Sequence, residues 1–265
     1  MQIIGLIPAA GQAHRITPLP CSKELYPVAI RRNDQDQSLR TKVVSHFLLE
    51  KMKLANVHNA FIIIRKGKWD IPAYYLDGKI ADMHLAYLLM DLPYGVPFSI
   101  DQAFPFILHA NVVFGFPDII FQPDDAFQKL IERQSETFAD IILGVFPAAD
   151  SQFADRIEVA PNANVKTIHK KTLKSHLKHT WLIAYWTPKF TQFMHDHLQD
   201  IKNGFPRSDT GHAEKPLIPE LSIGEVIQAA INHSLNVQSV HFLNGKWLDI
   251  GIPENLSKIH RPDFF

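Results

Sequence analysis

The sequence has very little cysteine: Cys21 is the only one among 265 residues. A single thiol cannot form a disulfide within the chain or build a Cys-x-x-Cys zinc site, which excludes both and favours a reducing compartment. Long apolar runs are also lacking, since none reaches the ~18 residues of a membrane span. The N-terminus has neither the charged region nor the small-residue cleavage site of a signal peptide. We therefore expect a cytoplasmic protein with no membrane partner.

The sequence also lacks an excess of charge of either sign. Lys and Arg number 27, Asp and Glu number 27, and no basic tail or stripe stands out. Proteins that bind a nucleic-acid backbone need such a stripe, so we expect no nucleic-acid partner. Hydrophobic residues make up 46% and charged residues 20%, which is typical of a soluble domain with a sizeable core.

Apolar segments with strand and helix patterns alternate through the first part of the chain. Alternation of this kind is typical of a mostly parallel sheet with helices on both faces. The predicted strands are Gln2–Pro8, Ala60–Ile64, Val112–Phe116 and Asp140–Phe146, and the predicted helices are Val43–Leu54, Ala103–His109 and Asp125–Gln134.

After Asp150 the pattern changes. Arg156–Val159 and Val165–His169 are separated by Pro-Asn-Ala-Asn and predict an antiparallel hairpin. Further strands are expected at Trp181–Trp186 and Val237–Phe242, helices at Lys189–Lys202 and Ile223–Ser234, and a long loop at Phe205–Pro219. No repeat or linker rich in Gly, Ser or Pro divides the chain, so we expect one domain over residues 1–265.

The segment that follows the first strand has the composition of a phosphate-binding loop. Ala9, Ala10 and Gly11 are small, so backbone N–H groups there can approach a polyphosphate. Arg15 can clamp phosphate oxygens, and Lys23 adds a second positive charge. The alternative is an ordinary strand-to-helix turn with two surface cations.

The wider spacing resembles the signature loop of the sugar-1-phosphate nucleotidyltransferases, a family that includes glucose-1-phosphate thymidylyltransferase and UTP–glucose-1-phosphate uridylyltransferase. Their pattern is roughly Ala-Gly-x-Gly-x-Arg, Pro-Leu, then Lys-x-x-x-Pro-Val, and this chain has Gly11, Arg15, Pro18-Leu19 and Lys23 to Val28. The resemblance implies that Ala9, Ala10 and Gly11 line the base and phosphates, and that Arg15 and Lys23 are catalytic. Ala13 and His14 replace the second glycine and the following Ser or Thr, which narrows the loop.

Two aspartates lie where this family holds its metal. Asp118 ends a buried apolar strand, and Asp249 lies in Trp247-Leu248-Asp249-Ile250-Gly251-Ile252-Pro253-Glu254, which resembles the family's Trp-x-Asp-x-Gly-Thr-Pro-Glu motif. By this resemblance both carboxylates would bind Mg²⁺, the usual means of offsetting charge on a reacting phosphate. An N-cap or turn role is the ordinary alternative for each aspartate.

Two further positions match the family more weakly. Gln102 lies where a loop contacts the nucleotide, so a hydrogen bond to the base or sugar is expected; a solvated side chain is the alternative. Lys171 falls on the lysine of the family's Glu-Lys-Pro turn and would pair with the substrate's phosphate. Lys170 replaces the glutamate of that turn, which exchanges an acceptor for a donor.

The resemblance spans Ile3 to Leu256 and implies an α/β, Rossmann-like nucleotidyltransferase (GT-A-like) fold, with a mostly parallel mixed sheet flanked by helices and a small β-rich elaboration on the substrate side. Residues 1–150 would form the nucleotide-binding half and residues 151–265 the sugar-phosphate-binding half. The expected substrates are an NTP and a sugar-1-phosphate, joined to an NDP-sugar with release of pyrophosphate and with Mg²⁺ as cofactor.

Two alternatives stay open at the level of sequence. One is a weakened or inactive homologue that binds a nucleotide or sugar nucleotide, and the other is a cytidylyltransferase for a non-sugar phosphate. The sequence fixes neither the base nor the sugar, and it is compatible with a homo-oligomer.

Overall fold

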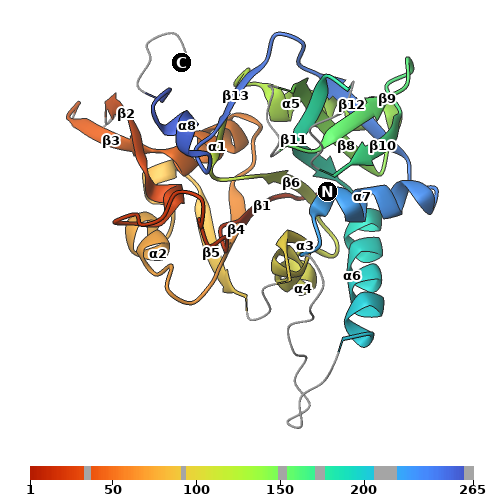
Figure 1. The fold of residues 1–265 in the computed structure, drawn as a ribbon, viewed down its shortest axis with the longest axis horizontal. Helices are drawn as coiled ribbons and strands as arrows, with labels where there is room; N and C mark the ends of the chain where they lie inside the picture. Colours follow the sequence, from red (N-terminus) through yellow and green to blue (C-terminus); the bar gives the residue numbers. More distant parts are fainter. Residues whose placement is uncertain (33–36, 91–93, 149–153, 171–176, 206–219, 260–265) are drawn as a thin grey trace.

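A seven-stranded mixed sheet runs through the middle of the computed structural model (Figure 1). The structure describes residues 1–32, 37–90, 94–148, 154–170, 177–205 and 220–259. The strand order is β12-β8-β11-β6-β1-β4-β5. Only β11 runs antiparallel to its neighbours among these strands. The strands are β1 (Ile3–Pro8), β4 (Asn59–Ile64), β5 (His84–Leu89), β6 (Asn111–Gly115), β8 (Ile141–Pro147), β11 (His179–Trp186) and β12 (Val237–His241). The expected α/β fold with a mostly parallel mixed sheet is confirmed.

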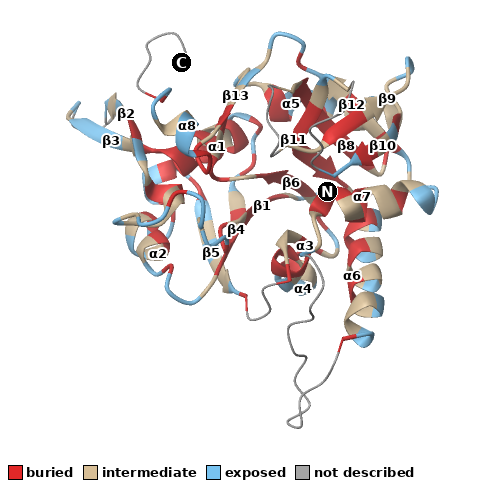
Figure 2. Cartoon of the chain, viewed as in Figure 1, coloured by how far each residue is buried: buried red, intermediate tan, exposed pale blue. Residues whose placement is uncertain are grey.

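Helices cover both faces of this sheet, and the strands between them are buried (Figure 2). Successive residues of β1 face opposite sides, so Leu6 packs in one core cluster and Ile7 in the other. One face is covered by α1 (Val44–Leu54), α2 (Asp70–Tyr75) and α5 (Ala126–Thr137). The other is covered by α3 (Val96–Ile100), α4 (Phe104–Ile107), α6 (Pro188–Asn203) and α7 (Ile223–Asn232).

Three two-stranded ribbons surround the main sheet. The expected hairpin is present as β9 (Arg156–Val159) and β10 (Val165–His169), which pair antiparallel. A second ribbon joins β7 (Ile119–Gln122) to β13 (Lys246–Asp249). The third, β2 (Pro27–Arg32) with β3 (Leu39–Val43), was not expected from the sequence, because its residues are largely polar and exposed.

The helix expected at Ala103–His109 is shorter in the structure. Helix α4 covers only Phe104–Ile107, and it is preceded by α3 and by the 3-10 turn η3 (Asp101–Ala103). Pro105 lies in the first turn of α4, where a proline is tolerated because the backbone N–H that it lacks would have no partner within the helix. The other short elements are η1 (Lys23–Leu25), η2 (Lys79–Ala81) and α8 (Pro253–Leu256).

Local sequence explains where several helices begin and end. Helix α7 begins with a capping box, in which the Ser222 side chain accepts from the Glu225 backbone N–H and the Glu225 carboxylate accepts from the Ser222 backbone N–H. Helix α1 is followed by Asn56, whose positive φ of 61° suits an asparagine at a helix end. Residues 206–219 of the expected loop lie outside the described residues. Within the described part of the chain, no helix is both long and apolar enough to span a membrane.

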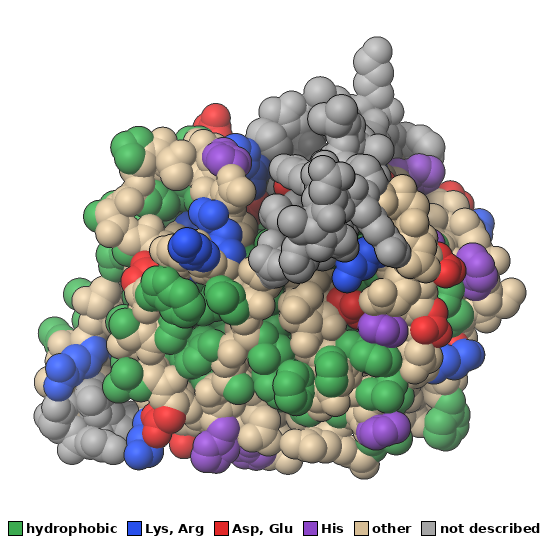
Figure 3. All heavy atoms as spheres, turned by 90° about the horizontal axis from the view of Figure 1, so that it is seen from below, with side chains coloured by type: hydrophobic (Ala, Val, Ile, Leu, Met, Phe, Trp, Pro, Cys, Tyr) green, Lys and Arg blue, Asp and Glu red, His purple; other side chains and the backbone are tan. Residues whose placement is uncertain are grey.

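Charged side chains are mixed in sign on the face seen from below. In Figure 3, Lys and Arg, Asp and Glu, and His side chains are interspersed around a broad apolar area. This distribution matches the formal net charge of zero.

Candidate functional site

A cavity of about 430 Å³ opens at the carboxyl ends of β1 and β6. Strand β1 lies at the point where the sheet order reverses, since β4 and β5 lie on one side of it and β6 on the other. Open α/β sheets place their ligand crevice at such a point. The described lining includes Ala10, Gly11, His14, Arg15, Lys23, Arg65, Met90, Val96, Ser99, Asp118, Thr180, Trp181 and Asp249.

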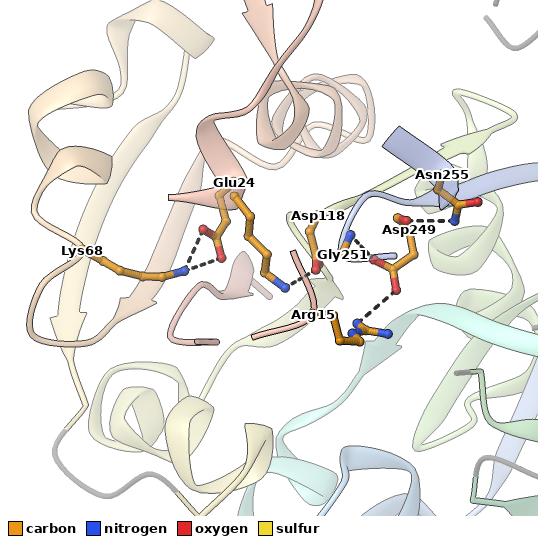
Figure 4. Close-up of polar contacts among 8 residues, drawn as sticks. Arg15, Glu24, Lys68, Asp118, Asp249, Gly251 and Asn255 are labelled. Carbon is orange, nitrogen blue, oxygen red and sulfur yellow. Dashed lines mark hydrogen bonds and ion pairs between the residues drawn. The ribbon is translucent and has the colours of Figure 1, made fainter. Parts of the chain in front are cut away.

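Asp118 and Asp249 lie together at the edge of this cavity (Figure 4). The β7–β13 ribbon brings them close, because Asp249 pairs with Ile119 and the Ile250 N–H donates to the Asp118 carbonyl at 3.0 Å. A Cβ built on Gly251 would lie 2.9 Å from Asp249 Oδ1 and 3.4 Å from Asp118 Oδ2. Both carboxylates therefore lie close to the same point, although the two aspartates are more than a hundred residues apart in the sequence.

The two carboxylates are held by different partners. The Lys23 ammonium donates to Asp118 Oδ2, and Arg15 Nη2 lies 3.6 Å from Asp249 Oδ2. Asp249 Oδ1 also accepts the Gly251 backbone N–H at 2.7 Å, and its carbonyl accepts the Asn255 side-chain amide at 2.9 Å (Figure 4). The loop of Asp249 is therefore fixed on two sides.

These contacts shift the pKa values of the two acids in opposite directions. Burial opposes ionisation of Asp118, but the charge and the hydrogen bond of Lys23, together with smaller contributions that include the charge of Lys68, outweigh it and lower the pKa of Asp118. Burial and the neighbouring Asp118 charge raise the pKa of Asp249 to about 6, although Lys23 and Arg15 act against the rise. Two carboxylates in one site whose pKa values move apart are typical of functional sites.

A buried ion pair beneath the cavity holds the turn that carries Lys23. Lys68 Nζ donates to both carboxylate oxygens of Glu24 at 2.7 Å, and Glu24 is only 1% exposed (Figure 4). The Asp70 carboxylate accepts from the Ser22 backbone N–H at 2.6 Å and from its hydroxyl at 2.7 Å. Residues 22–24 are thus anchored by the segment that follows β4, although the sequence pattern pointed to neither Glu24 nor Lys68.

Comparison with known proteins extends this description to the whole fold. No protein-family model matches the sequence, and no curated protein matches it. The structure does match solved structures. A Bacillus anthracis protein described as a glucose-1-phosphate thymidylyltransferase, in complex with sucrose, aligns with a TM-score of 0.76 at 17% identity, over 97% of this chain and 93% of that one.

Two further solved structures agree with this match. A UDP-glucose pyrophosphorylase complexed with UDP-glucose has a TM-score of 0.73 at 14% identity and covers 98% of this chain and 97% of its own. The UTP-bound UGPase of Acinetobacter baumannii has the same TM-score and identity and covers 100% and 96%. The chain has a sugar nucleotidyltransferase fold. The fold prediction is confirmed, whereas at these identities the reaction has to be argued from the site.

In this nucleotidyltransferase fold, the first loop divides between the cavity and the core. Ala10 and Gly11 line the cavity, whereas Ala9 is buried, packs in the core cluster of Ile7 and donates its N–H to the Ile63 carbonyl at 2.8 Å. Ala13 has a φ of 57°, a left-handed conformation that favours glycine. The loop therefore keeps a glycine-type backbone at Ala13, and His14 is exposed on the cavity lining.

The two weaker matches to the family lie apart from this cluster. Gln102 is exposed on η3 and is not among the described residues that line the cavity. Lys171 lies outside the described residues. Its neighbour Lys170 forms an ion pair with Glu225 at 3.0 Å, so its charge is directed to the start of α7.

Proposed function

We propose that the protein is a nucleotidyltransferase that joins an NTP to a sugar-1-phosphate and releases pyrophosphate. The observation that carries the proposal is the convergence of Asp118 and Asp249, with Lys23 and Arg15, in the cavity at the sheet's switch point. The nucleotidyltransferase fold of the solved structures supports the same reaction class.

The carboxylate pair suits a divalent cation. Burial and mutual repulsion raise the pKa of Asp249 to about 6, and a cation between the two acids would remove that repulsion. In the described part of the chain, no group of three or more His, Cys, Asp or Glu side chains could hold a metal. Asp118 and Asp249 would thus supply two ligands, as is common for Mg²⁺, which takes its other oxygens from water and substrate phosphates. When bound, Mg²⁺ would offset charge on the α-phosphate.

The remaining chemistry is assigned to side chains of the site. A phosphate oxygen of the sugar-1-phosphate forms a bond to the α-phosphorus, the bond between that phosphorus and the bridging oxygen breaks, and pyrophosphate leaves. Arg15 and Lys23 are positioned to neutralise negative charge on the triphosphate during this exchange. Ala10 and Gly11 leave room for the nucleotide to approach the backbone.

An inactive nucleotide-binding homologue is the competing function. It is motivated by Ala13, His14 and Lys170, and the structure favours the enzyme at Ala13 and at Lys170. Ala13 adopts the backbone that glycine would adopt, and Lys170 is paired with Glu225 outside the described cavity lining.

Pyrophosphate release provides the test. The purified protein is incubated with each NTP, Mg²⁺ and a panel of sugar-1-phosphates. We expect pyrophosphate with at least one pair of substrates, and a loss of about a hundredfold or more in Asp118→Asn and Asp249→Asn. Asp82→Asn is the matched control, since Asp82 is 87% exposed in its side chain. Nucleotide binding without pyrophosphate across the panel would instead favour the non-catalytic homologue.

A further inference from the structure

Arg65 lies in the same cavity but on the opposite side of β1 from the two aspartates. It directly follows β4, whose last residues are tied to both neighbouring segments: the Ala9 N–H donates to the Ile63 carbonyl and the Met90 N–H donates to the Ile64 carbonyl, each at 2.8 Å. Arg65 lines the cavity together with Met90. Its backbone is held by a turn in which the Lys68 N–H donates to the Arg65 carbonyl at 3.1 Å.

The guanidinium of Arg65 differs from the other cations of the site in its partners. Lys23 and Lys68 each donate to a carboxylate. Arg65 Nε is shielded from solvent and has no hydrogen-bond partner among the described residues. A buried donor without a partner is uncommon, which indicates that protein acceptors do not hold this guanidinium. Because Arg65 lines the cavity, its terminal N–H groups, and not the shielded Nε, are the donors that an acceptor on a ligand can meet.

The position of Arg65 indicates which part of a nucleotide would supply that acceptor. In the proposed function the triphosphate lies at Asp118 and Asp249, beyond β1 on the β6 side. The nucleoside would then extend toward the β4 and β5 side, where Met90 and Val96 provide apolar surface for a base. Ser99, which also lines this end, already donates to Met90 Sδ at 2.8 Å and to the Gly95 carbonyl at 3.2 Å.

We propose that Arg65 selects the nucleobase by donating two hydrogen bonds to a pair of adjacent acceptor atoms. This inference rests on the proposed function. Guanine presents such a pair in O6 and N7, and cytosine presents one in O2 and N3. Uracil and thymine place an N–H between their two carbonyls, and adenine places an amino group beside N7. A guanidinium has only donors, so each of these three bases leaves one of its hydrogen bonds unmade.

The test measures equilibrium binding of GTP, CTP, UTP, dTTP and ATP with Mg²⁺, so it does not depend on turnover. We expect wild type to bind either GTP or CTP about ten- to a hundredfold more tightly than the other three. Arg65→Met, which keeps an apolar stem and removes the donors, should reduce the affinity for that nucleotide to the level of the others. Lys66→Met, at an exposed neighbour outside the described lining, should leave all five affinities unchanged.

A base analogue identifies which of the two bases is read. If GTP is preferred, 7-deaza-GTP should bind as weakly to wild type as GTP binds to Arg65→Met, and the substitution should not weaken it further. If CTP is preferred, 3-deaza-CTP should behave in the same way. As a control for folding, Arg65→Met should have the same midpoint temperature of thermal unfolding as wild type.

Four results would overturn the inference. Preference for UTP, dTTP or ATP contradicts it directly. If Arg65→Met lowers the affinity for all five nucleotides equally, Arg65 contacts the phosphates and not the base. If it lowers none of the affinities, Arg65 does not contact the nucleotide. Neither result contradicts the proposed function. Failure of all five nucleotides to bind wild type would overturn the proposed function as well.

Discussion

Replacing Lys68 with methionine would measure how much the buried ion pair between Lys68 and Glu24 contributes to the stability of the fold. Lys68 Nζ is 2.7 Å from both Glu24 oxygens, and the two residues are 5% and 1% exposed. Methionine fills much of the same volume and removes the ammonium. Glu24 would then be a buried carboxylate without this partner.

The expected loss follows from that burial. Removing one partner of a buried pair costs about 3–5 kcal/mol, against a total stability of roughly 5–15 kcal/mol for a domain. Burial already raises the pKa of Glu24, and the charges of Lys68 and Lys23 hold part of this rise back. In Lys68→Met the pKa of Glu24 rises further, so the variant can relieve the cost by protonating Glu24.

This change gives the loss a pH dependence. A group whose pKa is raised by folding contributes stability below its unfolded pKa, and that stability is lost as the pH rises through the folded pKa. The difference between wild type and Lys68→Met should therefore be larger at pH 8 than at pH 5. Glu24→Gln combined with Lys68→Met should recover much of the loss at pH 8, because it leaves no buried charge.

Urea unfolding followed by tryptophan fluorescence measures these differences, since the chain has four tryptophans. Lys66→Met, an exposed lysine in the same turn, is the control and should change stability by less than about 0.5 kcal/mol. A loss below about 1 kcal/mol at pH 8, or an equal loss at both pH values, would refute the account of Glu24 as a buried charge that depends on Lys68.

Three more substitutions test other features of the structure. Ala13→Gly should raise the free energy of unfolding by about 1 kcal/mol, because it relieves a left-handed backbone at φ 57°; an unchanged urea midpoint would contradict this. Burial lowers the pKa of His46 to about 3, so as the pH drops below 6.5 wild type should lose about 1.4 kcal/mol per pH unit relative to His46→Gln; equal pH dependence of the two in urea titrations at pH 4–7 would contradict this. Gly251→Ala would place a Cβ 2.9 Å from Asp249 Oδ1 and 3.1 Å from Arg15 Nη2, and should lower pyrophosphate release on the order of a hundredfold; wild-type rates would show that these groups move aside without consequence.

Burial explains which strands the sequence made predictable. The central strands carry continuous apolar runs because both of their faces are covered, and β6 and β8 were predicted to within a residue or two. The ribbon of β2 and β3 is largely exposed, with only Val28 and Val43 buried, so its sequence is mixed and polar. Such a ribbon depends on tertiary contacts that no short sequence window contains.

The same contrast applies to the site. Asp118 follows the apolar strand β6, Asp249 is the last residue of β13, and both belong to recognisable blocks, so the sequence indicated both before their proximity was known. Lys68 and Arg65 belong to Arg-Lys-Gly-Lys, which in sequence is indistinguishable from a solvated basic turn. Lys68 is buried and Arg65 half-buried because β4 ends between β1 and β5, where Lys68 reaches Glu24.

The pairing within the site has a consequence for substrate binding. Lys23 and Arg15 contact the same two carboxylates that are proposed to hold Mg²⁺. When a metal-bound triphosphate binds, the two carboxylates would contact the metal, and Lys23 and Arg15 would contact phosphate oxygens. These contacts would replace the present ion pairs, so no buried charge would be left unpaired. The anchors on Glu24 and Asp249 would keep both loops in place during that exchange, since neither Lys68 nor the Gly251 N–H would have to move. Removal of an anchor should therefore impair turnover more than nucleotide binding.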